Sequence, residues 1–136
     1  MSTLSVNLGG TYVNRSRTGC DPWELAPFQR LDTYLETHLK GEVPYLIKID
    51  VEGHELLALS TAKDYFLKNG APKHVFSEFT PTFLERAGSK PVDYLNFLWD
   101  LGMTITHNGE TVVKDNEKYQ EILLSEYPLD IYAYSQ

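Results

Sequence analysis

The chain has 136 residues, of which 42% are hydrophobic and 12% aromatic, enough for one domain with a buried core and too apolar for a disordered chain. Its formal net charge of -7 argues against DNA or RNA as a partner, because phosphate backbones need a basic surface. The single cysteine, Cys20, excludes an intrachain disulfide, and no apolar run is long enough to span a bilayer. With no signal-peptide pattern at its start, the chain is expected to be cytoplasmic.

The first thirty positions, 1–30, are predicted to form an irregular segment because turn-forming residues recur in them. Short extended stretches are expected at Leu4–Leu8 and Thr11–Val13. Arg15 and Arg17 form the local basic cluster, which we interpret as part of a solvated loop rather than as an anion-binding pair.

Helical and strand patterns alternate over residues 31–136, which we assign to one domain. Helices are indicated by apolar residues at helical spacing, and strands by short runs of apolar residues between turn signals. The first expected elements are a helix capped by Asp32 and ended by Gly41, a buried strand at Tyr45–Val51, a helix at His54–Asn69 and a strand at His74–Phe79. A short helix from Pro81 to Arg86 follows, and then a helix with Ser89 as its cap and Gly102 at its end. The last elements are strands at 103–106 and 111–113 joined by an Asn108-Gly109 turn, a helix at 117–126 and a strand at 131–134. This order predicts an α/β fold with a mainly parallel sheet.

Acidic residues follow the first buried strand directly. Asp50, Glu52 and Glu55 lie at or just beyond its end, and Gly53 permits a sharp turn into the next helix. Glu78 lies at the corresponding end of the following strand. If the two strands are neighbours, four carboxylates converge on the edge of the sheet where ligands bind in parallel α/β folds. Such a cluster serves a cation, a donor ligand or proton transfer, since like charges repel.

A purely structural explanation also exists for part of this segment. Acidic residues at a helix start are favoured by the helix dipole and by capping, so Glu52 and Glu55 need no further role. His54 is either a ligand or general base, or an exposed residue at a helix start. The carboxylates suit magnesium or calcium, but their spacing fits no calcium-binding loop, so we assign no metal.

The segment Lys48-Ile49-Asp50-Val51-Glu52-Gly53-His54-Glu55 resembles the signature of the FkbM family of methyltransferases, a strand reading roughly L-K-I-D-V-E-G followed by an acidic residue and a leucine-rich helix. Leu31-Asp32, Leu56–Leu59 and Val75–Glu78 resemble the segments that flank it in the family. The resemblance implies a partial Rossmann-like methyltransferase sheet with a C-terminal antiparallel hairpin. It also implies S-adenosylmethionine as the cofactor and O-methylation of a small-molecule or sugar hydroxyl.

The resemblance further implies roles for individual residues. Asp50 would lie near the methyl donor or acceptor and Glu78 on the acceptor side, both as catalytic residues. Glu52, Gly53, His54 and Glu55 would contact the substrate or cofactor. The identity of the methyl acceptor does not follow from these residues.

One element of the family pattern is not found. Family members begin with a strand, a glycine-rich turn and a helix that hold the cofactor, whereas Gly9-Gly10 precedes no predicted helix. We therefore expect the chain to be the C-terminal half of such a domain and to bind S-adenosylmethionine weakly or not at all alone. The Tyr45–Val51 strand would then be an exposed edge, covered by Leu4–Val13, by a second copy or by a complementing chain, unless the sequence is a truncated product of a longer gene. The alternative function is that of a non-catalytic interaction or oligomerisation module.

Overall fold

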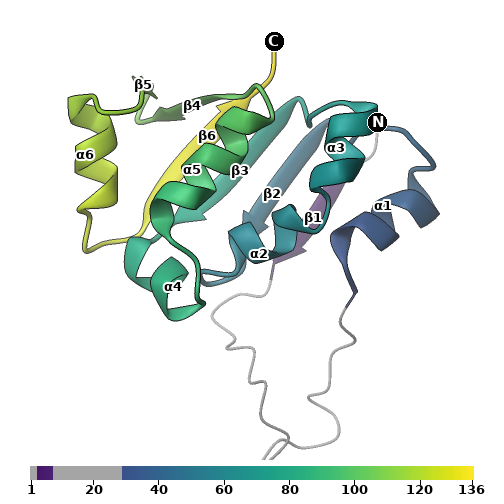
Figure 1. Ribbon diagram of the computed structural model, residues 1–136, viewed down its shortest axis with the longest axis horizontal. Helices are drawn as coiled ribbons and strands as arrows, with labels where there is room; N and C mark the ends of the chain where they lie inside the picture. The colour runs from purple at the N-terminus through teal and green to yellow at the C-terminus, as the bar shows by residue number, and fades with distance from the viewer. Residues whose placement is uncertain (1–2, 8–28) are drawn as a thin grey trace, which may run out of the picture.

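A computed structural model describes residues 3–7 and 29–136, and these form one six-stranded sheet with helices packed against it (Figure 1). The strands are β1 (Thr3–Asn7), β2 (Leu46–Asp50), β3 (His74–Phe79), β4 (Thr104–His107), β5 (Glu110–Val112) and β6 (Leu129–Tyr134). The helices are α1 (Leu31–His38), α2 (Glu55–Ser60), α3 (Lys63–Asn69), α4 (Pro81–Arg86), α5 (Pro91–Asp100) and α6 (Glu117–Leu123). The expectations for Gly9-Gly10, Thr11–Val13, Arg15, Arg17 and Cys20 lie outside the described residues.

The strands lie in the order β1-β2-β3-β6-β4-β5. β1, β2 and β3 are parallel, whereas β6 is antiparallel to both β3 and β4, and β4 is antiparallel to β5. The predicted α/β class is confirmed, but the prediction of a mainly parallel sheet is wrong. After α5 the chain forms the β4–β5 hairpin and returns through α6, and this path inserts β6 between β3 and β4 in the opposite direction.

The predicted hairpin turn lies at Asn108-Gly109, between β4 and β5. Both residues have positive φ angles, 50° at Asn108 and 80° at Gly109. Asparagine and glycine tolerate this left-handed conformation, and two such residues match the twist of a tight hairpin.

The N-terminal strand β1 covers the edge that was expected to be exposed. It pairs in parallel with β2, from Thr3 opposite Leu46 to Asn7 opposite Asp50. The backbone groups of β2 are therefore paired on both sides, by β1 and by β3. Of the three expected ways of covering this edge, the structure shows the first, in which N-terminal residues of the same chain do so.

The sheet has one buried face and one open face. Side chains alternate along each strand, and those on the buried face include Ile47, Ile49, Val75, Phe79, Ile105, Ile131 and Ala133. Figure 1 shows α1, α2, α3 and α5 on the near side of the sheet, where they cover this face. The strand residues that alternate with these buried ones have their side chains on the opposite face, which no described helix covers.

The helix expected at His54–Asn69 is two helices, α2 and α3, that meet at Thr61 and Ala62. Ala62 has φ -99° and ψ 10°, outside regular helical geometry. The Thr61 hydroxyl donates to the Ala58 carbonyl at 2.8 Å and accepts from the Leu31 amide at 3.1 Å. This contact ties the break to the start of α1, and the apolar spacing alone does not reveal it.

Two predicted helix caps are wrong. α1 begins one residue before Asp32, whose carboxylate instead accepts from the Arg30 guanidinium at 2.8 Å. The N-cap position of α5 is Lys90 rather than Ser89, and Ser89 is buried just before it. In both cases a proline or apolar residue opens the helix without a side-chain cap.

Candidate active site

The turn between β2 and α2 is built around two residues with positive φ angles, Glu52 at 53° and Gly53 at 92°. A Cβ atom on Gly53 would lie 2.3 Å from the carbonyl oxygen of Phe83 in α4. Glycine is therefore required here both by the backbone conformation and by the close approach of α4. The turn itself explains this residue, and its expected contact with a ligand stays a prediction.

Glu55 braces the same turn from inside the protein. Its side chain is 2% exposed, and its Oε1 atom accepts from the Val51 amide at 3.0 Å and from the Gly53 amide at 3.3 Å. Burial raises the pKa of this carboxyl, with a further contribution from the charge of Asp50. Glu55 thus supports the turn from within, and its predicted contact with substrate or cofactor is untested.

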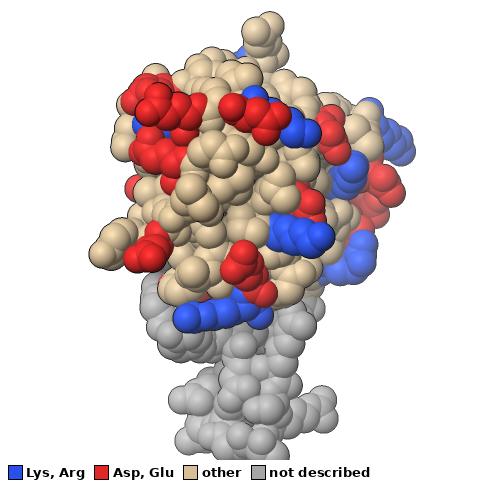
Figure 2. All heavy atoms as spheres, turned by 60° about the vertical axis from the view of Figure 1, so that its left-hand side comes forward, with Lys and Arg blue, Asp and Glu red and all other residues tan. Residues whose placement is uncertain are grey.

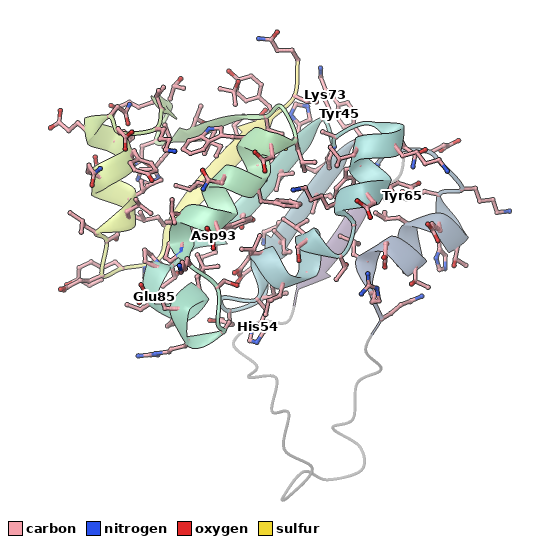
Figure 3. The ribbon with its side chains drawn as sticks, viewed as in Figure 1. Tyr45, His54, Tyr65, Lys73, Glu85 and Asp93 are labelled. Atoms are coloured by element: carbon pink, nitrogen blue, oxygen red, sulfur yellow. The ribbon has the colours of Figure 1, made fainter. Side chains whose placement is uncertain are left out.

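His54 is the residue immediately before α2, and Figure 3 places it at the end of the sheet where β2 leads into that helix. Its Nδ1 atom donates to the Val51 carbonyl at 3.2 Å. The ring is half-buried and held by the turn. A role for it in binding a ligand also stays a prediction.

Asp50 and Glu78 lie side by side at the carboxyl ends of β2 and β3. Ile49 pairs with Ser77, so the next residue along each strand is Asp50 and Glu78 respectively, and both project onto the open face. Each is half-buried. The structure therefore brings together the two residues predicted to be catalytic.

The environment of Glu78 disfavours its ionised form. Partial burial raises the pKa of this carboxyl, and the nearby charges of Asp50, Glu52 and Glu55 raise it further. The Thr80 hydroxyl donates to Glu78 Oε1 at 2.8 Å, which opposes the shift and fixes the orientation of the carboxylate. A raised pKa makes the Glu78 carboxylate a stronger base than an ordinary one.

A shallow cleft of about 470 Å³ lies over these carboxylates on the open face. Its lining residues come from β2, β3 and β6 and are Leu46, Lys48, Ile49, Asp50, Phe76, Ser77, Glu78, Asp130 and Ile131. Asp130 was not predicted as a site residue. It faces Glu78 across the β3–β6 pairing, and only the insertion of β6 beside β3 reveals that contact.

A buried series of hydrogen bonds lies behind the end of β3 that carries Glu78. The Tyr94 hydroxyl of α5 donates to the Ser77 hydroxyl at 2.8 Å, and Ser77 donates to the Glu78 backbone carbonyl at 2.8 Å. Complete burial strongly raises the pKa of Tyr94, so this hydroxyl stays protonated. These two hydrogen bonds link α5 to the end of β3, where Glu78 lies.

Within residues 3–7 and 29–136, no group of three or more histidine, cysteine, aspartate or glutamate side chains is placed to hold a metal ion. In the same part of the chain, no helix combines the length and the apolar character needed to cross a membrane.

On the side of the molecule drawn in Figure 2, basic side chains are interspersed with acidic ones.

Residues 26–105 match the family described as the methyltransferase FkbM domain, a region that contains β2, β3 and the carboxylates at their ends. No curated protein and no solved structure matches the chain.

Proposed function

Because the chain belongs to the FkbM methyltransferase family, we propose that it supplies one rim of a methyl-transfer site. In this proposal Asp50 lies nearest the transferred methyl group, and Glu78 accepts the proton of an acceptor hydroxyl. The single observation that carries it is the pair of half-buried carboxylates at the ends of neighbouring parallel strands, in one cleft. Ligands of parallel α/β sheets bind at this place.

The chemistry of the rim fits one end of S-adenosylmethionine. Carboxylate oxygens of Asp50 and Glu52 can accept from an ammonium or hydroxyl group, and they attract positive charge. S-adenosylmethionine, when bound, supplies an electrophilic methyl group. Within the described residues, the turn after β2 contains Glu52 and one glycine, and β3 leads through Thr80 directly into α4, so neither connection is a glycine-rich cradle for the rest of the cofactor.

Glu78 is suited to the proton transfer. Its raised pKa makes it a stronger base than an ordinary carboxylate, and the Thr80 hydroxyl holds it in one orientation. The Glu78 carboxylate would accept the proton of the acceptor hydroxyl, while S-adenosylmethionine would supply the methyl group, its S–CH3 bond breaking so that the sulfur leaves as a neutral thioether. A small-molecule or sugar hydroxyl fits the open, shallow shape of the cleft.

A backbone amide NMR titration with S-adenosylmethionine tests the proposal. We expect fast-exchange shifts at the amides of residues 50–53 and 78, with a dissociation constant on the order of 1 mM because the described residues supply only one rim of the site. Asp50→Asn should remove these shifts. Asp93→Asn, an exposed carboxylate on α5 labelled in Figure 3, is the matched control and should leave them intact.

Two results would contradict the proposal. Shifts confined to another part of the molecule would show that Asp50 and Glu78 do not form the site. Slow-exchange binding in the micromolar range would show that the chain needs no further surface to hold the cofactor.

A further inference from the structure

Methyl transfer explains only one end of the open face of the sheet. β1, β2 and β3 are parallel, and parallel strands are normally buried on both faces by helices. Among the described residues, the helices lie on one face only (Figure 1). The opposite face therefore presents the residues of a sheet interior to the surface.

Five aromatic side chains cross this face and form what we call the aromatic band: Tyr45, His74, Phe76, Tyr132 and Tyr134. The rings of Phe76 and Tyr132 stack with centroids 4.5 Å apart, and the Tyr132 hydroxyl lies 2.7 Å from His74 Nδ1. Phe76 is nonetheless 45% exposed and Tyr45 49% exposed. The band is thus a partly exposed surface of aromatic rings that contact one another.

Three carboxylates lie at one end of the same face and form what we call the acidic end: Asp50, Glu78 and Asp130. Lys48 is the one basic residue that shares the cleft with them. Along β3 and β6, the aromatic residues Phe76 and Tyr132 are followed towards this end by Glu78 and Asp130. The far end of the sheet carries Tyr45 and Lys73 instead (Figure 3).

We propose that the open face docks an amphipathic helix of a partner protein, with its apolar side chains on the aromatic band and its basic side chains on the acidic end. A helix is favoured over a second sheet because helices are the usual cover of parallel strands. Its N-terminus lies over Asp50 and Glu78, where the positive end of the helix dipole faces their negative charges.

A second copy of this chain is the less favoured occupant. Each copy has a net charge of -7, and its open face carries three carboxylates against one lysine in the cleft. Two such faces repel one another unless the acids are neutralised. Charge complementarity instead selects a basic partner.

This surface is distinct from the sheet edge, which β1 already covers. A helix docked on it overlies the cleft and covers Asp50 and Glu78, so it would compete with the proposed cofactor and acceptor for these carboxylates. Docking of the helix is read out by binding alone and does not depend on methyl transfer.

The test uses a designed helical peptide of about 18 residues, long enough to be helical in water when rich in alanine. One face carries leucines at helical spacing, and the first turn carries two lysines. A second peptide has glutamates in place of the lysines, and a third has the leucines scattered. Fluorescence anisotropy with the full chain should show the lysine peptide binding at least tenfold more tightly than either control.

Variants of the chain locate the contact. Phe76→Glu should abolish binding of the lysine peptide. Asp130→Lys should weaken the lysine peptide and strengthen the glutamate peptide, whereas Glu36→Lys, an exposed residue on α1, should change neither. Thermal melts confirm that each variant is folded, and the peptide comparison on the unaltered chain is decisive even if Phe76→Glu is not.

The proposal is overturned if the lysine peptide shows no preference over its controls or binds Phe76→Glu equally well. It is also overturned if sedimentation shows a dimer of the unaltered chain that Phe76→Glu converts to a monomer. That result would assign the open face to a second copy.

Discussion

Gly53 lies directly against Phe83, so that a Cβ atom at this glycine would come within 2.3 Å of the Phe83 carbonyl oxygen. Gly53→Ala should therefore destabilise the protein by about 3 kcal/mol, through the strain of a positive φ angle together with the displacement of α4. Gly102→Ala is the matched control, since Gly102 also has a positive φ angle but nothing lies within 4 Å of its Cβ position. It should cost only about 1 kcal/mol. Urea denaturation of both variants measures the difference, and equal losses would mean that α4 does not constrain the turn.

The role of Glu55 as a brace predicts a difference between two substitutions. Glu55→Ala leaves the amides of Val51 and Gly53 without their acceptor and should destabilise the protein by about 2–4 kcal/mol. Glu55→Gln keeps an acceptor oxygen and removes a buried charge, so it should cost much less. Chemical denaturation at neutral pH checks this. If the two variants are equally unstable, the negative charge of Glu55 matters more than its hydrogen bonds.

The raised pKa of Glu78 predicts a pH-dependent stability. The folded protein holds this proton more tightly than the unfolded chain, whose glutamate keeps the ordinary pKa of 4.5. The contribution to stability is complete below that value and is lost as the pH rises through the folded-state pKa. Glu78→Gln should therefore match the native chain in melting temperature at acid pH and exceed it at pH 7. Glu36→Gln controls for removal of one exposed carboxylate. A melting temperature that falls at pH 7 on Glu78→Gln would contradict the predicted direction.

The buried pair Tyr94 and Ser77 should show energetic coupling. Tyr94→Phe removes one hydrogen bond and should cost about 1 kcal/mol, whereas Ser77→Ala leaves the Tyr94 hydroxyl buried without a partner and should cost about 1–3 kcal/mol. The double variant should lose less than the sum of the two, because the second change removes the orphaned hydroxyl. Additive losses in a double-mutant cycle would show that the hydrogen bond contributes nothing to stability.

Much of the fold was accessible from local patterns. The apolar run before Asp50 and the one before Glu78 predicted β2 and β3, and the Asn108-Gly109 turn predicted the β4–β5 hairpin, because these signals depend on neighbours in sequence. The position of β6 was not predicted, since its pairing with both β3 and β4 depends on the path of the whole C-terminal segment.

The residues of the candidate site were likewise predictable from sequence only in part. Asp50 and Glu78 could be named because each ends a recognisable strand, whereas Asp130 reaches the cleft only through the pairing of β6 with β3. Glu55 was predicted as a ligand contact from the family resemblance. Its burial and its hydrogen bonds to the turn depend on tertiary packing, which sequence spacing does not report.

The most direct test of the proposed methyl-transfer site is to measure the pKa of Glu78 by carbon NMR of its side-chain carboxyl, with and without S-adenosylmethionine. In the free protein the pKa should exceed the ordinary value of 4.5, because of partial burial and the charges of Asp50, Glu52 and Glu55. Saturating S-adenosylmethionine should lower it, since a positive charge beside the rim favours the carboxylate. A Glu78 pKa that is ordinary in the free protein, or that S-adenosylmethionine leaves unchanged, would contradict the claim that these carboxylates form a methyl-transfer site.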